Sequence, residues 1–134
     1  MSKGFLRYQM PAIIWAVLIF VLSSIPSDVF PDLGIFRFDK VIHAVVFALF
    51  ALLVFLALRH QQRFPGLARH SYSITILIVI LYGAVDEFHQ RFVAGRSSDL
   101  FDLIADALGA CVVVFFLWLH SRRQVAPPVV PPLH

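Results

Sequence analysis

The chain has 134 residues, of which 60% are hydrophobic and only 14% are charged. A soluble domain of average composition is about 45–50% apolar and about 25% charged. Because a protein this small has too little interior to bury so many apolar side chains, the composition disfavours a soluble enzyme domain, a nucleic-acid binder and a disordered chain, and it favours a small integral membrane protein. The single cysteine, Cys111, excludes an internal disulfide framework and a cysteine-rich zinc site.

Four apolar segments follow one another along the chain, and we interpret each as a membrane-spanning helix. We expect these helices at about residues 9–25, 41–58, 72–92 and 99–120. The first segment is followed by Ser-Ser-Ile-Pro-Ser, which lacks a small-x-small cleavage pattern, so we expect a helix there and not a cleaved signal peptide. The segments are too long and too continuously apolar for barrel strands, and four strands cannot close a barrel. The sequence therefore predicts an all-α bundle of four transmembrane helices.

Basic and acidic residues fall on different connections of this bundle. The stretch before the first helix, the second connection (about residues 59–70) and the tail carry seven of the 11 basic residues and no acidic residue. The positive-inside rule then places both termini in the cytoplasm and the first and third connections outside. We expect a single domain over residues 1–122 in the bacterial cytoplasmic (inner) membrane. Residues 123–134 are proline-rich, and we expect them to form a loosely ordered cytoplasmic tail.

Ionisable residues occupy the expected outer ends of three helices, although a buried charge costs at least about 2.5–3.5 kcal/mol at a helix centre. They are Asp39, Lys40 and His43 on the second helix, Asp86, Glu87, His89 and Gln90 on the third, and Asp99, Asp102 and Asp106 on the fourth. Spacings of three or four residues put His43 on a shared face with Asp39 and Lys40. They also put Asp86, His89 and Gln90 on one stripe, with Glu87 on the adjacent stripe, and Asp99, Asp102 and Asp106 on one stripe of the fourth helix. Counted at a rise of about 1.5 Å per residue, His43, Asp86 and Asp106 reach a similar depth. They are expected to converge in a polar pocket that opens to the outer face.

This polar layer contains more acidic than basic residues. The acids of the three helices face only Lys40, Arg91 and Arg96, so some of them must be protonated, paired with histidine or bound to a cation. Glu87 and Arg91 are four residues apart and are expected to pair. Below the layer, Gly109 lets a neighbouring helix approach closely.

Three spaced motifs occur in one order along this part of the chain. They are Asp39-Lys40-x-x-His43, then Asp86-Glu87-x-His89-Gln90, and finally Gly95-Arg96 followed by Asp102, Asp106 and Gly109. Together they resemble the VanZ-like family of small bacterial membrane proteins, and the match covers about residues 39–109. The resemblance implies a membrane protein of the cell envelope without a secure enzymatic activity. It also implies a link to antibiotic resistance, because the founding member is associated with resistance to the glycopeptide teicoplanin.

The polar layer suggests a site for an anionic envelope lipid or a lipid-linked cell-wall precursor. Arg96, Arg91 and Lys40 would hold phosphate oxygens, and His43 or His89 would act as general acid or base, oriented by Asp39 or Asp86. The candidate catalytic residues are thus His43, His89 and Asp86, and the candidate binding residues are Arg96, Lys40, Arg91, Glu87, Gln90, Asp39, Asp102 and Asp106. No serine or cysteine nucleophile stands beside these histidines in the motifs, so binding is favoured over catalysis and enzymatic activity stays open.

Three other hypotheses explain the same residues. The layer can be a purely structural network in a scaffold or interaction protein, in which each charge satisfies another. It can hold a divalent metal at His43, Asp86, Glu87 and His89, although this spacing resembles no standard zinc motif and no cofactor is expected. It can also line the path of a small ion-coupled transporter, which would have to form a homo-oligomer. All of these readings have membrane lipid as a partner and none requires nucleic acid.

Overall fold

The computed structural model describes residues 3–27 and 39–124, and within these ranges every regular element is a helix. The elements are η1 (Phe5–Gln9), α1 (Met10–Ser23), α2 (Asp39–His60), α3 (Pro65–Arg69), α4 (Ser71–Gln90) and α5 (Leu100–Gln124). Four helical segments are long and apolar enough to cross a membrane, namely Phe5–Ser23, Asp39–His60, Ser71–Gln90 and Leu100–Gln124. The prediction of an all-helical protein with four candidate spans is confirmed. Most of the proline-rich tail lies outside the described residues.

Two details differ from a simple row of four helices. η1 is a π-helical turn that runs straight into α1, and the amide of Met10 donates to the carbonyl of Phe5, five residues back. Pro11 follows directly and has no amide hydrogen to donate, which favours such a wide turn at this point. The second connection contains the short helix α3, which begins at Pro65, where the fixed φ angle of proline suits a first helical turn.

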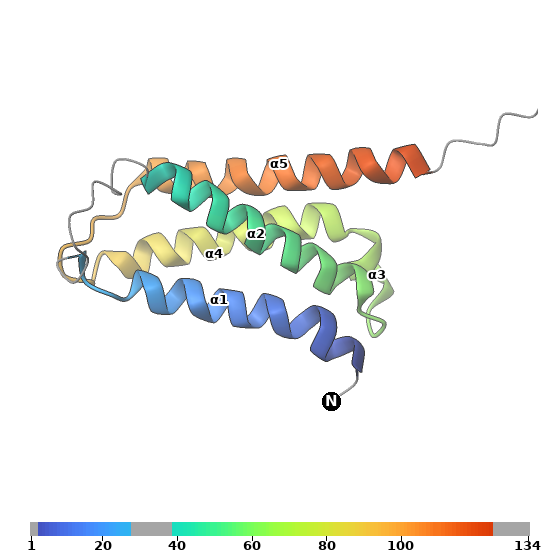
Figure 1. Cartoon of the computed structure of the whole chain (residues 1–134). Coiled ribbons are helices and arrows are strands. Elements are labelled where there is room, and N and C mark those ends of the chain that lie inside the picture. The colour runs from blue at the N-terminus through green and yellow to red at the C-terminus, as the bar shows by residue number, and fades with distance from the viewer. Residues whose placement is uncertain (1–2, 28–38, 125–134) are drawn as a thin grey trace, which may run out of the picture.

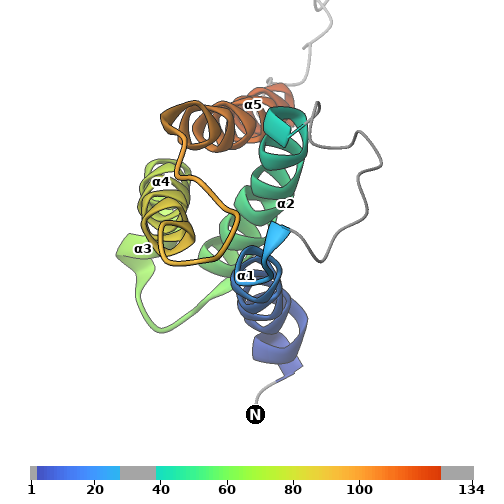
Figure 2. The same ribbon diagram turned by 90° about the vertical axis from the view of Figure 1, so that its left-hand side faces the viewer.

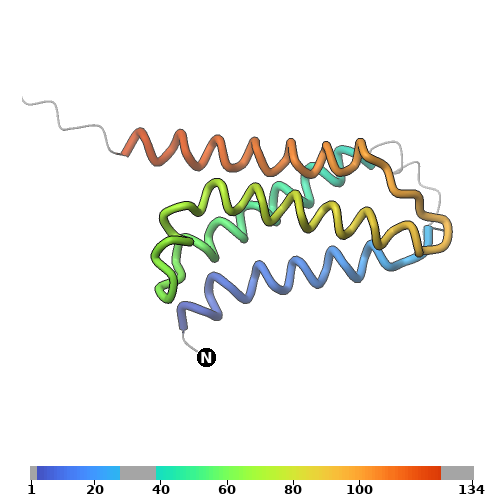
Figure 3. The backbone as a smooth tube through the Cα atoms, turned by 180° about the vertical axis from the view of Figure 1, so that it is seen from behind, coloured from blue at the N-terminus to red at the C-terminus, as the bar shows by residue number. Residues whose placement is uncertain are grey.

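The helices run alternately up and down (Figures 1 and 3). The end of α1, the start of α2, the end of α4 and the start of α5 lie together, and we call this the acidic end. The opposite end holds the start of η1, helix α3 and the end of α5, and we call it the basic end. It carries seven basic residues: Lys3, Arg7, Arg59, Arg63, Arg69, Arg122 and Arg123. The two ends of the described chain therefore lie on the same side of the bundle.

Helix α2 occupies the centre of the bundle and makes its most extensive contact with α5 (Figure 2). The best buried apolar side chains of the core are Phe47, Phe50, Ala51, Val54, Val79 and Ala110. Gly109 of α5 lies directly against the backbone of Ala44 in α2. A Cβ atom at Gly109 would collide with the carbonyl oxygen of Ala44 and lie 3.0 Å from its carbonyl carbon. The close approach expected at Gly109 is confirmed.

Helix α1 is peripheral, because within the described residues it contacts η1, α2 and α4 but not α5. Only Ala12, Ile19 and Ser23 of α1 are buried. Side-chain hydrogen bonds to backbone carbonyls compensate for this small buried area: Gln9 Nε2 to Ala57 at 2.9 Å, Trp15 Nε1 to Val46 at 3.1 Å and Tyr82 Oη to Ala16 at 2.6 Å. Apolar packing therefore holds α2, α4 and α5 together, and polar contacts contribute strongly to fixing α1.

Candidate functional site

Asp86 and His89 of α4 face the last turn of α1. Asp86 Oδ1 accepts a hydrogen bond from Ser23 Oγ at 2.5 Å, and Asp86 Oδ2 accepts one from Gln90 Nε2 at 3.0 Å. His89 Nε2 lies 2.9 Å from Ser24 Oγ. Both carboxylate oxygens of the buried Asp86 thus have partners on α1 and α4. These contacts fasten the end of α1 to α4.

A second group of charges joins α2 to the start of α5. Lys40 Nζ lies 2.8 Å from Asp99 Oδ2 and 3.0 Å from Asp102 Oδ1. The side chain of Lys40 is 51% exposed, whereas that of Asp102 is 5% exposed. The Lys40 ammonium holds the pKa of Asp99, which lies just outside the α5 span, below its ordinary value. Lys40 therefore bridges an exposed and a buried carboxylate.

Asp106 is fully buried between α2 and α4. Its Oδ1 lies 3.0 Å from His43 Nδ1. Its Oδ2 has no hydrogen-bond partner within residues 3–27 and 39–124 and faces Gly83, where an added Cβ would lie only 2.8 Å away. The absence of a side chain at Gly83 thus leaves the room that this carboxylate occupies.

Glu87 turns toward α5 and not toward Arg91. Its Oε2 accepts a hydrogen bond from the Asp99 amide at 2.8 Å, and its buried Oε1 has no partner among the residues that the structure describes. Within the described residues Glu87 makes no ion pair, so the expected pairing with Arg91 is wrong. The reason is that the start of α5 offers Glu87 a free backbone amide, while Arg91 lies over the ring of Phe88 at 6.0 Å.

A pocket of about 120 Å³ lies between α1, α2 and α4. His43, Asp86 and Gln90 line it together with apolar side chains. Asp106 does not line this pocket, but it contacts His43, which does. The structure therefore brings His43, Asp86 and Asp106 into one region of the acidic end.

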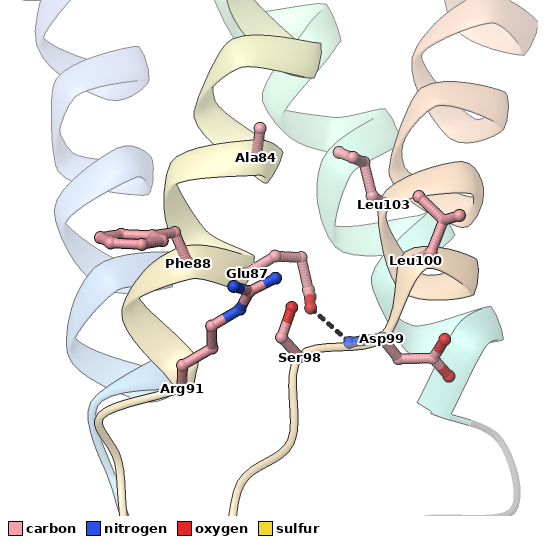
Figure 4. A pocket seen from close by; sticks show the side chains of 8 residues that line it. All are labelled: Ala84, Glu87, Phe88, Arg91, Ser98, Asp99, Leu100 and Leu103. Atoms are coloured by element: carbon pink, nitrogen blue, oxygen red, sulfur yellow. Dashed lines mark hydrogen bonds between the residues drawn. The ribbon is translucent and has the colours of Figure 1, made fainter.

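A larger pocket of about 400 Å³ lies between α4 and α5, and we call it the lateral pocket (Figure 4). It is lined by Ala84, Glu87, Phe88, Arg91, Ser98, Asp99, Leu100 and Leu103. Arg91, Ser98 and Asp99 lie near the connection between the helices, whereas Ala84 and Leu103 lie further along them (Figure 4). The pocket is thus polar at the end of the bundle and apolar toward its middle.

The charged side chain of Arg96 also donates hydrogen bonds to backbone carbonyls at the end of α1. Its Nε lies 3.3 Å from the Ile25 carbonyl oxygen and its Nη2 lies 3.4 Å from that of Leu22. Carbonyls at a helix C-terminus have no partners within the helix, and Arg96 supplies donors to them. Nearby, Gly95 has φ +71°, and its carbonyl accepts from Ser27 Oγ at 2.6 Å. The connection between α4 and α5 is therefore tied to the end of α1.

The four residues considered for a metal are not gathered around one point. Among the described residues, His43, Asp86, Glu87 and His89 do not place three ligand atoms together, since Asp86 and His89 face α1. A different group does so: one ligand atom each of Asp39, His43 and Asp102 lies within 4.8 Å of the others.

Comparison with known proteins identifies the relationship. A family model described as VanZ/LLP1 matches residues 8–121. The chain belongs to the VanZ/LLP1 family. The matched region contains all four candidate spans almost completely and every candidate site residue.

An uncharacterized protein of Schizosaccharomyces pombe is 32% identical over 88 residues, which are 65% of this chain and 51% of that protein. The chain thus spans about half the length of this relative. No solved structure matches the chain.

Sequence reasoning missed several residues of the acidic end. Ser23 and Ser24 were expected only to extend the first span, yet they bond to Asp86 and His89. Two adjacent hydroxyls at the end of an otherwise apolar segment were the available signal. Ser98 lines the lateral pocket beside Asp99, and nothing in its spacing distinguishes it from an ordinary turn residue.

Proposed function

We propose that this VanZ/LLP1-family membrane protein binds the phosphate-bearing headgroup of an anionic lipid in the lateral pocket. The observation that carries the proposal is the polarity of that pocket. Its polar residues lie at the end of the bundle and its apolar residues lie deeper, as Figure 4 shows. A lipid has the same order, with a charged headgroup at the membrane surface and hydrocarbon below it. Phe88 and Leu100 are 58% and 69% exposed, so the apolar wall is open to lipid chains.

Arg91 is the group in the pocket best suited to a phosphate. A guanidinium presents planar donors that match phosphate oxygens, and Arg91 makes no ion pair within the described residues. Ser98 adds a hydroxyl on the opposite side of the opening (Figure 4). The Asp99 carboxylate points away from Arg91 toward Lys40, which reduces its repulsion of an anion.

Binding, and not catalysis, is what this pocket supports. No histidine is among the residues that line it. The general acid or base role expected for His43 or His89, and the orienting role expected for Asp86, belong to the smaller pocket and to the contact with α1. They are therefore outside this proposal.

The same charge distribution supports an orientation. The basic end carries seven basic residues, which the positive-inside rule assigns to the cytoplasm. The lateral pocket would then open at the outer leaflet, and the lipid would be one of that leaflet. In a bacterium this is the outer leaflet of the inner membrane.

Two sources can supply a lipid phosphate at this site, namely a phospholipid and a polyprenyl-linked envelope precursor. The similarity to a protein of a yeast, which is a eukaryote, favours a phospholipid that different kinds of membrane share. A role in teicoplanin-type resistance would follow only if the precursor were the ligand. The experiment therefore includes a phospholipid and a polyprenyl phosphate as separate probes.

Native mass spectrometry of the purified protein tests this proposal, with phosphatidylglycerol, a polyprenyl phosphate and zwitterionic phosphatidylcholine as probes. We expect Arg91→Gln to bind the anionic probes at least about tenfold more weakly, because a charge-assisted hydrogen bond contributes about 1.5–3 kcal/mol. Arg63→Gln at the basic end is the matched control and should bind as the unchanged protein does. Equal binding of the anionic probes by Arg91→Gln and the unchanged protein would refute the proposal. So would equal affinity of the unchanged protein for all three probes.

A further inference from the structure

We propose that Asp39, His43 and Asp102 bind one divalent transition-metal ion, of the zinc or manganese class, where α2 meets α5. One ligand atom of each residue lies within 4.8 Å of the others. Asp39 and His43 are one helical turn apart on α2, and Asp102 comes from α5. This group is separate from the lateral pocket and from the contacts of α1, and it does not rest on the lipid proposal.

The spacing of the three ligand atoms suits a metal ion after a small closing movement. Nitrogen and oxygen ligands bind zinc at about 2.0–2.2 Å, which places neighbouring ligand atoms roughly 3.0–3.5 Å apart. Rotation of the Asp39 and Asp102 side chains can cover the difference without moving a helix. The backbones are already held close to each other by the contact of Gly109 with Ala44.

His43 has the kind of carboxylate partner that metal-binding histidines usually have. Its Nδ1 lies 3.0 Å from the buried Asp106 carboxylate, which fixes the ring and leaves Nε2 for a ligand. Histidines that bind metals commonly donate their other ring N–H to a carboxylate, and this partner raises the basicity of the ligand nitrogen. Asp106 is thus a positioning residue, and Asp39 and Asp102 are the oxygen ligands.

Two buried carboxylates lie beside the group, Asp106 through its contact with His43 and Glu87 through its contact with the Asp99 amide. Glu87 is 5% exposed and Asp106 is fully buried, yet in the described part of the chain Glu87 Oε1 and Asp106 Oδ2 have no hydrogen-bond partner. Glu87 reaches from α4 to the start of α5, where its Oε2 accepts a hydrogen bond from the Asp99 amide, three residues before Asp102. Unpaired carboxylates in a buried site are costly, and a divalent ion nearby offsets their charge.

Lys40 competes with the ion for Asp102. Its Nζ contacts Asp102 Oδ1 at 3.0 Å and Asp99 Oδ2 at 2.8 Å. Because the Lys40 side chain is half exposed, it can stay with Asp99 while Asp102 turns toward the metal. Removing this ammonium should therefore strengthen metal binding, which a merely structural salt bridge would not predict. One imidazole nitrogen with two carboxylates favours Zn²⁺ or Mn²⁺ over Mg²⁺.

Calorimetric titration of the full chain in detergent, stripped with a chelator, tests the site with Zn²⁺, Mn²⁺ and, as a control ion, Mg²⁺. We expect one Zn²⁺ or Mn²⁺ per chain, and weaker binding of Mg²⁺. His43→Gln should reduce the affinity at least 100-fold, while the matched control His60→Gln, on an exposed residue at the basic end, should bind as the unchanged protein does. Asp106→Asn should weaken binding about 10–100-fold, as is typical of a residue that orients a ligand.

Lys40→Gln keeps the proposal testable if the buried substitutions prevent folding. It removes an exposed ammonium and should bind Zn²⁺ more tightly than the unchanged protein. The absence of saturable binding to the unchanged protein, or equal binding by His43→Gln and His60→Gln, would overturn the proposal. An unchanged or lower affinity of Lys40→Gln would also count against it. Because no anionic lipid is added, these outcomes are independent of those for the lateral pocket.

Discussion

Replacing Gly109 with alanine places a methyl group at the point where α5 crosses α2. The nearest neighbour of this methyl is the carbonyl oxygen of Ala44, and the carbonyl carbon lies 3.0 Å away, closer than the ordinary contact range of 3.4–4 Å. A flexible side chain could turn aside, but a carbonyl inside a helix cannot, so the helices must separate. Overpacking of this kind costs typically about 1–3 kcal/mol. Because backbone has to move, we expect the upper part of this range.

The assay is thermal unfolding in detergent, with Gly66→Ala as the matched control. Nothing lies within 4 Å of a Cβ added at Gly66, so the control should unfold within a degree or two of the unchanged protein. At roughly 4 °C per kcal/mol, Gly109→Ala should lower the midpoint by about 8–12 °C. His43 directly precedes Ala44, so the same change should also weaken Zn²⁺ binding. A midpoint for Gly109→Ala equal to that of the control would refute the close crossing.

Two further predictions concern single contacts. Tyr82→Phe removes the 2.6 Å hydrogen bond to the Ala16 carbonyl and should destabilise the protein by about 0.6 kcal/mol. The measurement is limited proteolysis, in which α1 should be cleaved faster than in the unchanged protein and α5 should not. Lys40 lowers the pKa of Asp99 in the folded protein. Their contact therefore stabilises the fold fully at pH values above 3.8, the ordinary pKa of an aspartate, and this stabilisation is lost as the pH falls through the lower pKa of the folded state. The difference in unfolding temperature between the unchanged protein and Asp99→Asn should therefore be constant from pH 8 to 5 and shrink below about pH 4, whereas a difference that grows on acidification would contradict it.

The span pattern could be predicted because it depends on local sequence. Four long apolar segments and the separation of basic from acidic connections are visible without any tertiary information. The depth of His43 and Asp106 could likewise be counted along each helix. The 3.0 Å contact between His43 and Asp106 could not be predicted, because it depends on where α2 crosses α5. Gly109 indicates that a close approach occurs, but it does not say which helix approaches.

The roles of the arginines were harder to predict for a related reason. Arg96 looked like the strongest anion ligand, yet it donates to the Leu22 and Ile25 carbonyls. Those carbonyls lie where α1 ends and no i+4 amide continues the helix, and only the folded chain brings that end beside the connection from α4 to α5. Arg91 was expected to pair with Glu87, and the amide of Asp99 replaces it for the same reason. In both cases backbone groups at a helix end competed with the expected side-chain partner.

The contacts of α1 suggest how anchoring and binding can be separated at the acidic end. Because α1 buries few side chains, it depends on the hydrogen bonds that Asp86 and His89 make with Ser23 and Ser24. Substitutions at these two α4 residues would therefore loosen the end of α1 whether or not a ligand binds nearby. Lys40 lies on the other side of the bundle end and has no contact with α1 among those found in the described residues. A loss of function on changing Asp86 is thus expected from a structural role alone, whereas an effect on changing Lys40 reports on the group between α2 and α5.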